Sequence, residues 1–267
     1  MILIYGVSLL PVGILRIFRS AKPLEQQEKE HPELEPGGHY RPPNCTARHR
    51  VAIIIPYRNR AEQLPPFFNH MHAFLQRQQI EYSIFIVEQT GNDPFNRGFL
   101  MNVGAIEALK RYKIDCFVFH DVDLLPEDDR NLYTCPDQPR HLSTLVDSLG
   151  YKLLSVDMFG GVTSLTTEQF KIVNGFSNKF WGWGGEDDDM GNRVKFHGFL
   201  ITRYPLNIGR YTMLTHKKAV PGPDRFKNLY SGSKRFATDG INSAKYKVLD
   251  IKIKPLYTWI AVQLYNS

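Results

Sequence analysis

The first half of the chain alternates between apolar runs and amphipathic segments. Residues 51–55 form a continuous apolar run rich in β-branched side chains, which is typical of a strand buried on both faces of a parallel sheet. A second strand is predicted over 82–87 and a third over 116–123, with helices over 62–79 and 99–112 between them. This β-α-β-α-β order predicts an α/β fold.

The second half is less regular, and its pattern predicts shorter elements. In chain order these are a loop and then a helix over 131–153, a strand over 152–159 closed by Gly160 and Gly161, a helix opened by Thr166 and Gln169 that runs to Val173, a strand over 201–206, a loop over 221–239, and closing strands within 248–264.

One stretch has no explanation in packing: Trp181-Gly-Trp-Gly-Gly leads directly into the four acidic residues 186–189. Four adjacent carboxylates repel one another, so they predict a cationic partner or a need for a base. Glycines allow close backbone approach and an indole offers a flat apolar face, which together suit a sugar ring. Alternatively, Asp188 and Asp189 simply cap a helix, because acidic side chains are favoured in its first turn.

A second informative place is Asp121-Val-Asp123, at the end of the third predicted strand. Because side chains alternate along a strand, Asp121 and Asp123 are expected on the same side. Two carboxylates there suit Mg²⁺ or Mn²⁺ together with substrate phosphates, although Asp-x-Asp is also common in solvated turns. Met213 and His216 show no metal signal on their own, since a lone histidine is usually structural and a thioether is soft.

Composition restricts the function classes. The chain has 267 residues, enough for one large domain or two joined halves, and Lys and Arg exceed Asp and Glu by six. That excess suits a small anionic substrate or a membrane surface, and no basic run resembles a nucleic-acid-binding arm. The three cysteines fit no zinc pattern. Asn44-Cys-Thr is a glycosylation sequon, which indicates a secretory route.

The amino-terminal segments predict no folded domain. Residues 1–20 are mostly apolar but short for a membrane span, so they could be a signal-like segment, a shortened anchor or the start of a truncated gene model. Residues 21–44 contain five glutamates and five prolines and are expected to form a solvated linker.

Taken together, the motifs resemble the β-1,4-galactosyltransferase family, including the invertebrate β-1,4-N-acetylgalactosaminyltransferases. The resemblance covers about residues 40–264. Its motifs, in chain order, are Pro56-Tyr-Arg-Asn-Arg60, Phe95-Asn-Arg97, Asn102-Val-Gly104, Asp121-Val-Asp123, Phe159-Gly-Gly161, Trp181-Gly-Trp-Gly-Gly-Glu-Asp-Asp-Asp189 and Asp239-Gly-Ile-Asn242.

The resemblance implies a GT-A glycosyltransferase fold, a Rossmann-like mixed sheet with an acceptor-binding half. Residues 45–267 would be the catalytic domain, with a nucleotide-binding half at 45–125 and a metal, acceptor and catalytic half at 126–267. Such a protein would lie in the Golgi membrane as a type II protein with a lumenal catalytic domain. It would use Mn²⁺ to transfer galactose or N-acetylgalactosamine from the uridine diphosphate (UDP) sugar, with inversion, onto the 4-OH of a terminal N-acetylglucosamine of a glycan.

Site roles follow by matching position. Asp187 would be the base and Glu186 would contact the transferred sugar, while Trp183 would lie on a mobile loop over the donor. The other implied residues are Asp123, Met213 and His216 for Mn²⁺; Pro56, Arg58, Arg60, Phe95, Arg97, Asp121, Val122, Met158 and Gly184 for the nucleotide sugar; and Asp188, Arg225 and Phe226 for the acceptor. The resemblance also implies a disulfide between Cys116 and Cys135.

Departures from the family pattern bear on the donor and the amino terminus. Met158 stands where many galactose-transferring relatives have tyrosine, which leaves room for an N-acetyl group and favours UDP-N-acetylgalactosamine, with strict galactose specificity as the alternative. The loop between His216 and Arg225 is shorter than in the best-known mammalian members, so no acceptor preference is carried over. Cys45 matches a cysteine whose partner would lie further upstream, which supports a shortened amino terminus.

Two other classes compete with this interpretation. A glycoside hydrolase also uses paired carboxylates, but it has no use for Asp121 and Asp123 at a nucleotide-type crevice. A catalytically silent sugar-binding or Ca²⁺-binding protein would use the acidic stretch only to hold a cation. Sugar release from a disaccharide without UDP would favour the first class, and binding without turnover would favour the second.

Overall fold

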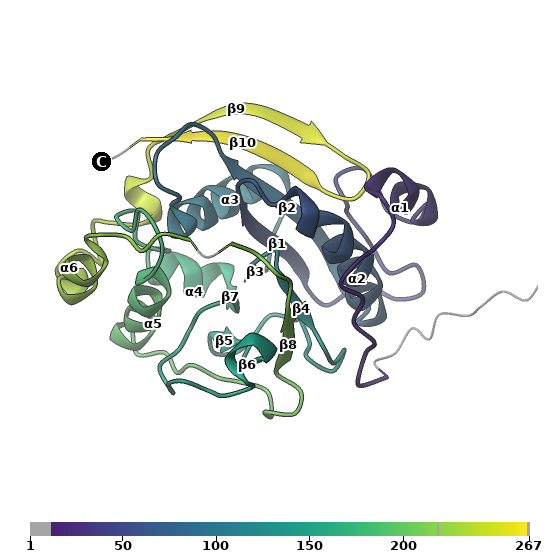
Figure 1. Ribbon diagram of the computed structural model, residues 1–267, viewed down its shortest axis with the longest axis horizontal. Coiled ribbons are helices and arrows are strands. Elements are labelled where there is room, and N and C mark those ends of the chain that lie inside the picture. The colour runs from purple at the N-terminus through teal and green to yellow at the C-terminus, as the bar shows by residue number, and fades with distance from the viewer. Residues whose placement is uncertain (1–11, 218, 266–267) are drawn as a thin grey trace, which may run out of the picture.

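A mixed seven-stranded sheet forms the centre of the computed structural model, which describes residues 12–217 and 219–265 (Figure 1). The strand order is β5-β7-β3-β1-β2-β10-β9, and the four strands from β3 to β10 are parallel. The strands are β1 (Arg50–Tyr57), β2 (Glu81–Gln89), β3 (Cys116–His120), β5 (Arg140–His141), β7 (Val162–Thr166), β9 (Tyr246–Ile253) and β10 (Thr258–Leu264).

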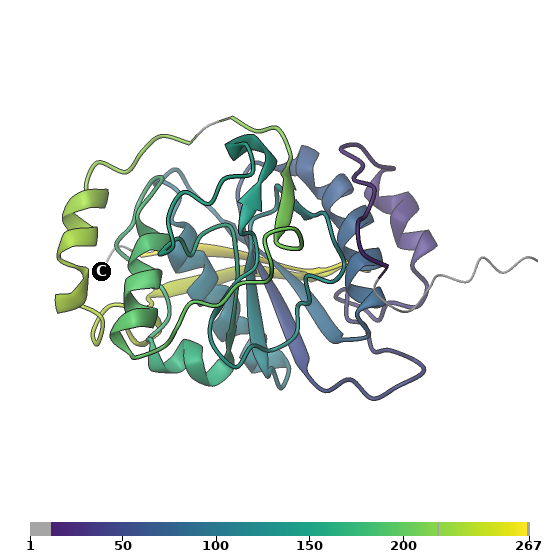
Figure 2. The same ribbon diagram turned by 90° about the horizontal axis from the view of Figure 1, so that it is seen from below.

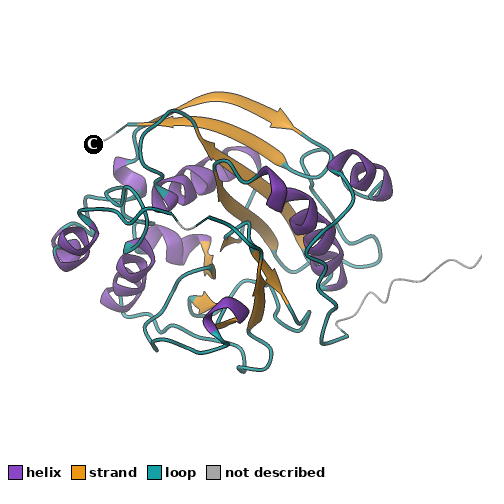
Figure 3. Cartoon of the chain, viewed as in Figure 1, coloured by secondary structure: helices purple, strands orange, loops and turns teal. Residues whose placement is uncertain are grey.

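Helices cover both faces of this sheet (Figure 3). The helices are α1 (Leu24–Glu30), α2 (Leu64–Arg77), α3 (Arg97–Arg111), α4 (Thr167–Ile172), α5 (Glu186–Phe196) and α6 (Arg225–Tyr230), of which α2 and α3 pack on opposite faces of the sheet. Short 3₁₀ turns lie at η1 (Ala61–Gln63), η2 (Asp147–Leu149), η3 (Gly232–Lys234) and η4 (Ile241–Ser243). Helices α1 and α6 lie at opposite ends of the molecule in both ribbon views (Figure 2).

The two faces of β1 belong to two separate apolar cores, because successive side chains of a strand point to opposite faces. Val51, Ile53 and Ile55 pack in the core that contains Phe67 and other side chains of α2. Ala52 and Ile54 pack in the core that contains the apolar side chains of α3. The strand is therefore buried on both sides, as its unbroken apolar run predicts.

A glycine allows α3 to lie close against the sheet. A Cβ built on Gly104 would lie 2.9 Å from Val87 and closer still to Ile54, so a larger residue here would force the helix away from β1 and β2. Because α3 begins at Arg97, this packing also fixes where the first turn of the helix meets the carboxyl ends of the strands.

A second, three-stranded sheet lies beside the first, with the order β4-β8-β6. Its strands are β4 (Leu124–Pro126), β6 (Leu145–Val146) and β8 (Arg210–Met213). Leu124 pairs with Met213 in an antiparallel register. This small sheet therefore joins the segment after Asp123 to the segment before His216.

The amino-terminal region differs from the solvated linker expected for residues 21–44. Residues 24–30 form α1, Gln27 and Tyr40 are buried, and Tyr40 pairs with Tyr82 beside β2. Among the residues that the structure describes, no helix has the length and apolar character needed to cross a bilayer. Most of the possible anchor or signal-like segment at 1–20 lies in residues 1–11, outside the described part.

Several elements predicted for the second half are wrong. The predicted helix within 131–153 is replaced by β5, β6 and η2, and the predicted strands at 152–159 and 201–206 are irregular. Leu154 and Val156 are 65% and 75% exposed, so β propensity alone does not produce a strand without a pairing partner. Residues 221–239 contain α6 and η3, which bury few apolar side chains and so leave no periodic signal.

Of the other predictions for this half, two are confirmed and one is wrong. Helix α4 begins with a capping box in which the Thr166 side chain accepts from the Gln169 N–H and the Gln169 side chain accepts from the Thr166 N–H. The glycines at 160 and 161 precede β7 and do not close a strand. The closing strands within 248–264 correspond to β9 and β10.

Cys116 and Cys135 form a disulfide that closes a loop across a sequence separation of 19 residues, and Cys45 is a free, exposed thiol. Replacing both bonded cysteines by alanine should lower the free energy of unfolding by about 3 kcal/mol, because a cross-link of this span restricts the unfolded chain. Urea denaturation measures this change. Cys45→Ala is the matched control and should leave the midpoint unchanged; equal loss in both variants would contradict the assignment.

Candidate functional site

A crevice for a ligand is expected where the carboxyl ends of β1 and β3 meet. Helix α2 follows β1 on one face of the sheet and α3 follows β2 on the other. Strand β3 then pairs with the opposite side of β1 from β2, so the order in which strands are added reverses between β1 and β3. Open α/β sheets bind ligands outside such a reversal. Pro56 at the end of β1 and Val122 just after β3 are both buried at this edge.

Basic and aromatic side chains lie along the same edge. The guanidinium of Arg58 donates to the Asp93 carbonyl at 2.7 Å and lies 5.3 Å from the centre of the Phe95 ring. Arg60 donates to the Lys217 carbonyl at 3.2 Å. Arg58 and Phe95, which come from different loops, are thus brought into one cation–π contact.

Arg97 connects this edge to the acidic stretch. Its Nε lies 2.6 Å from Oδ1 of Asp121, its Nη1 lies 3.4 Å from Oε1 of Glu186, and its Nη2 donates to the Gly161 carbonyl at 3.1 Å. Burial disfavours the charge of Arg97, but the attraction of Asp121 and Glu186 is stronger, so the pKa of Arg97 lies above its ordinary value. Residues far apart in sequence therefore form one charged cluster.

Asp121 and Asp123 do not lie on the same side of a strand, although the sequence predicts that they do. Strand β3 ends at His120, so strand alternation does not set the directions of these side chains. Asp121 faces Arg97, whereas Oδ2 of Asp123 lies 2.8 Å from Nδ1 of His216. Burial and repulsion from Asp121 raise the pKa of Asp123 to about 6, while His216 and Arg60 oppose the rise.

The donor set at Asp123 fits a divalent ion such as Mn²⁺. Two ligand atoms bound at right angles to one ion at about 2.1 Å lie about 3 Å apart, close to the Asp123–His216 distance of 2.8 Å. Met213 pairs with Leu124, one residue after Asp123, so it lies in the same small sheet. Within the described residues no three His, Cys, Asp or Glu side chains are arranged to hold an ion. The Met213 sulfur would be a softer donor than the carboxylate and imidazole of this pair.

The acidic residues 186–189 occupy the first turn of α5, where the helix dipole favours negative charge. Gly185, with φ of +96°, provides the left-handed turn into the helix. Glu186 is buried; burial and repulsion from Asp187 raise its pKa to about 7, although Arg97 opposes the rise. Burial and Asp187 also raise the pKa of the more exposed Asp188.

Asp187 lies against a glycine. A Cβ built on Gly160 would overlap the Asp187 carboxylate, so a larger residue here would displace this side chain. The Oδ1 atom of Asp187 accepts from the N–H of Asp188 at 3.0 Å. Met158, two residues before Gly160, is half-buried, and its carbonyl accepts from Arg203 at 2.7 Å.

The tryptophan segment before α5 is held mainly through its backbone. The N–H of Gly182 donates to the Phe95 carbonyl and the N–H of Trp183 donates to the Val220 carbonyl, both at 2.9 Å. The Trp183 side chain is 58% exposed, and the guanidinium of Arg225 lies 5.5 Å from its ring centre. Gly184 also has positive φ, a backbone conformation that glycine adopts without strain.

Arg225 and Phe226 begin α6, beside the tryptophan segment. The Arg225 guanidinium lies 4.6 Å from the centre of the exposed Phe226 ring. Among the described residues, three buried polar atoms in this region have no hydrogen-bond partner: Nη1 of Arg225, Nε1 of Trp181 and Oε2 of Glu186. Unpaired buried polar atoms are uncommon in folded proteins, and these three are free to hydrogen-bond with a bound polar ligand.

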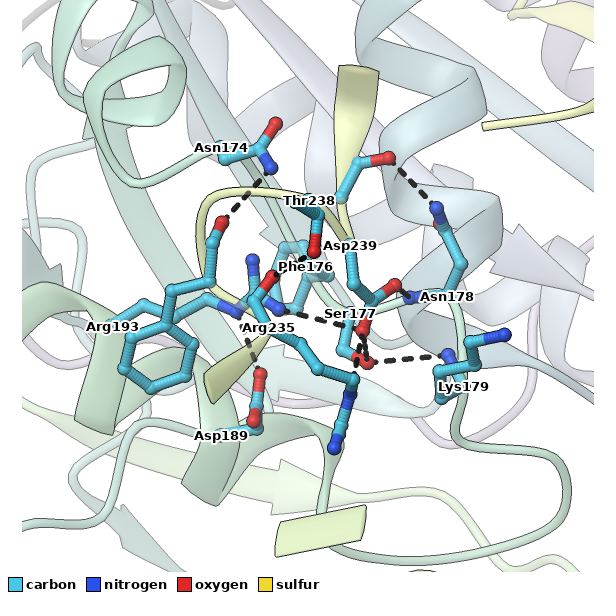
Figure 4. A network of polar contacts seen from close by, with 12 residues as sticks. Asn174, Phe176, Ser177, Asn178, Lys179, Asp189, Arg193, Arg235, Thr238 and Asp239 are labelled. Atoms are coloured by element: carbon cyan, nitrogen blue, oxygen red, sulfur yellow. Dashed lines mark hydrogen bonds and ion pairs between the residues drawn. The ribbon is translucent and has the colours of Figure 1, made fainter. Parts of the chain in front are cut away.

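Behind the acidic turn lies a buried polar network that the sequence analysis missed (Figure 4). Arg193 is fully buried, and its Nε lies 2.7 Å from Oδ2 of Asp189. Asp239 accepts from the N–H of Asn178 at 2.9 Å and lies 3.7 Å from Nη2 of Arg193. The spacing of Asp189 and Arg193, four residues apart on a helix, is the signal that could have revealed the pair.

This network also corrects the view of Asp189 as only a helix cap. Its carboxylate points to Arg193 inside the protein, and burial raises its pKa while Arg193 opposes the rise. The sequon residue Asn44 lies elsewhere. It is exposed and next to Cys45, whose sulfur contacts Gln79 just before β2, at the amino-terminal edge of the sheet.

Two family models match most of the chain. The N-terminal region of glycosyl transferase group 7 matches residues 7–136, and the model described as the N-terminal domain of galactosyltransferase matches residues 140–217. The chain is 49% identical over 254 residues to β-1,4-galactosyltransferase 4 of Cricetulus griseus, covering 94% of this chain and 74% of that protein. It is 48% identical over 261 residues to β-1,4-galactosyltransferase 1 of Mus musculus, covering 96% of this chain but only 65% of that protein.

Solved structures of Drosophila β1,4-galactosyltransferase 7 are also similar. The catalytic domain in complex with xylobiose is 32% identical with a TM-score of 0.69. A mutant in complex with manganese, UDP-Gal and xylobiose is 30% identical with a TM-score of 0.66. Each comparison covers 82% of this chain and 95% of the other. This similarity confirms the α/β GT-A fold predicted from the sequence.

The raised pKa of Glu186 predicts a pH-dependent stability difference. Its folded pKa of about 7 exceeds the ordinary value of 4.5, so its contribution to stability is full below about pH 4.5 and is lost as pH rises through 7. Glu186→Gln should therefore raise the free energy of unfolding relative to the unsubstituted protein by about 1–3 kcal/mol at pH 8 and much less at pH 5.

Urea denaturation at both pH values measures this difference. Glu168→Gln removes an exposed carboxylate and should give no pH-dependent difference. A Glu186→Gln effect of equal size at pH 5 and pH 8 would show that the raised pKa is wrong.

Proposed function

The chain belongs to the β-1,4-galactosyltransferase family, and from this premise we propose a specific reaction. The protein is an inverting, Mn²⁺-dependent glycosyltransferase that moves N-acetylgalactosamine or galactose from the UDP-sugar, in β-1,4 linkage, onto a terminal N-acetylglucosamine of a glycoprotein or glycolipid glycan. Residues 45–125 form its nucleotide-binding half, and residues 126–267 supply metal, acceptor and base residues.

One observation carries the proposal: Arg97 contacts both Asp121 and Glu186. Asp121 lies at the carboxyl edge of the parallel strands, where a nucleotide would bind, and Glu186 lies one residue before Asp187. A base beside a nucleotide-sugar crevice is what transfer to an acceptor requires, whereas a hydrolase or a silent cation-binding protein has no need for the connection.

Asp123, His216 and Met213 would hold Mn²⁺. When bound there, the ion would neutralise the negative charge that develops on the departing diphosphate. Arg58, Arg60 and Arg97 add positive charge along the same edge, which favours an anionic nucleotide. The complex of Drosophila β1,4-galactosyltransferase 7 with manganese and UDP-Gal supports this assignment by similarity.

Asp187 acts as the general base. It takes the proton from the 4-OH of the acceptor sugar, whose oxygen then attacks the anomeric carbon of the donor. The bond between that carbon and the diphosphate oxygen breaks, and UDP leaves with the electron pair. Attack from the side opposite the leaving group inverts the anomeric configuration, from α in the donor to β in the product.

The tryptophan segment excludes water from the donor. Water at the anomeric carbon would hydrolyse the UDP-sugar, so transfer needs a cover that closes after the donor binds. Trp183 is exposed between two glycines of positive φ, Gly182 and Gly184, which allows such a movement. Asp188, Arg225 and Phe226 then provide polar and apolar contacts for the acceptor.

The preferred donor is UDP-N-acetylgalactosamine, and the proposal rests on Met158. Its unbranched side chain is half-buried two residues before Gly160, which lies against Asp187. The alternative is strict specificity for UDP-galactose, which is supported by the names of the similar proteins.

We also propose that the protein is a type II Golgi membrane protein with a lumenal catalytic domain. The Cys116–Cys135 disulfide supports passage through an oxidising compartment, and the exposed sequon at Asn44 is accessible for glycosylation.

The decisive experiment compares transfer from both UDP-sugars onto terminal N-acetylglucosamine, with and without Mn²⁺. Asp187→Asn should reduce transfer at least about a hundredfold, the lower range for loss of a general base, while UDP affinity stays near normal. Transfer rates and isothermal titration with UDP measure the two quantities. Near-normal turnover in the variant would show that Asp187 is not the base.

Met158→Tyr tests the donor preference. A larger side chain with a hydroxyl should occupy the space for the N-acetyl group, so the ratio of kcat/KM for UDP-galactose to that for UDP-N-acetylgalactosamine should rise about tenfold or more. Met158→Leu keeps an apolar side chain of similar volume and should change the ratio much less. An unaltered ratio in the tyrosine variant would remove the basis for favouring the acetylated donor.

A further inference from the structure

We propose that the amino-terminal arm, residues 12–23, positions Met213 for metal binding through an ion pair between Arg19 and Asp147. The inference rests on the proposed Mn²⁺-dependent function and extends it to a segment that lies outside the catalytic motifs. Arg19 and Asp147 act through Met213, so both are positioning residues and neither contacts the reacting sugar.

The arm is docked on the small sheet before it reaches Arg19. The N–H of Gly13 donates to Oδ1 of the buried Asp129 at 2.7 Å, and the Asp129 N–H donates back to the Gly13 carbonyl at 3.0 Å. The N–H of Leu15 donates to the Glu127 carbonyl at 2.8 Å, and Leu15 packs against the apolar core. The arm therefore lies along the segment that follows β4.

Three polar groups converge on Met213. Its N–H donates to Oδ1 of Asp147 at 2.8 Å, its carbonyl accepts from Nη1 of Arg19 at 2.6 Å, and its sulfur accepts from Oγ of Ser148 at 3.2 Å. Arg19 also donates through Nη2 to Oδ2 of Asp147 at 2.6 Å. The Arg19–Asp147 ion pair thus holds both the N–H and the carbonyl of Met213.

The strand order explains why this ion pair is needed. Strand β6 pairs with β8 through Leu145 and Val146 and then ends, whereas β8 continues to Met213. Past the end of β6, the Asp147 side chain and the arm take over the hydrogen bonds of Met213. Without these hydrogen bonds, the Met213 backbone would be held only by the pairing of β8 with β4, where Met213 lies opposite Leu124.

The thioether is the ligand whose position matters most for Mn²⁺. It is a soft donor and binds a hard ion weakly, so it contributes only if it is already in place. Asp123 and His216 are hard or intermediate donors that meet each other directly at 2.8 Å. Loosening Met213 should therefore weaken Mn²⁺ binding and leave binding of Mg²⁺, which prefers oxygen ligands, nearly unchanged.

The test uses the full-length protein and three single substitutions. Arg19→Met removes the guanidinium, and Asp147→Asn keeps an oxygen for the Met213 N–H but removes the charge. Arg16→Met is the matched control, because Arg16 lies in the same arm and its guanidinium stacks on Phe18. Free Mn²⁺ counted by electron paramagnetic resonance gives the dissociation constant without reference to activity, and isothermal titration gives that of Mg²⁺.

Arg19→Met and Asp147→Asn should each weaken Mn²⁺ binding about threefold to fivefold, as expected for one partly exposed ion pair. The dissociation constant of the double variant should rise by less than the product of the two single effects, since both substitutions remove the Arg19–Asp147 ion pair. Arg16→Met should bind Mn²⁺ as the unsubstituted protein does, and Mg²⁺ binding should change little in all variants.

Three results would overturn the inference: unchanged Mn²⁺ binding in Arg19→Met, equal losses for Mn²⁺ and Mg²⁺, or an equal loss in Arg16→Met. The second would indicate general disorder of the site, and the third would indicate an effect of net charge. Failure of the unsubstituted protein to bind Mn²⁺ would instead contradict the proposed function itself.

Discussion

The site depends on one largely buried cation between two carboxylates. Arg97 contacts Asp121, which follows a strand of the central sheet, and Glu186, which begins α5. A buried guanidinium is stable only with partners, and buried carboxylates repel one another without a cation. Each group therefore makes the burial of the others possible, and the two halves of the site cannot separate without leaving an unpaired charge.

The same logic explains the ionic pair behind the acidic turn. Arg193 meets Asp189 and Asp239 in a fully buried position, so α5 is held on its inner side by charge pairing while Asp187 faces Gly160. Among the described residues, Oε2 of Glu186 and Oδ1 of Asp189 both lack a hydrogen-bond partner, so unpaired buried oxygens occur on both sides of the turn.

Sequence reasoning predicted the parallel core well because the signal there is local and strong. The unbroken apolar run of β1 and the capping box of α4 each depend on neighbouring residues alone. It failed at 152–159 and 201–206, where partner strands decide the outcome, and at α6, where no apolar face is buried. The acidic turn and the Asp-Val-Asp segment were visible as motifs, but the Arg97 contacts join residues 24 and 89 positions apart, which no local pattern encodes.

The position of β10 has a consequence for biosynthesis. This strand, Thr258–Leu264, pairs in parallel with residues 85–89 of β2 and lies between β2 and the edge strand β9. The β2 strand thus keeps an open edge until residues 258–264 have left the ribosome, and the long sequence separation makes this pairing slow. During translation the nascent chain would expose the flank of β2, which is an opportunity for chaperone binding and a risk of aggregation.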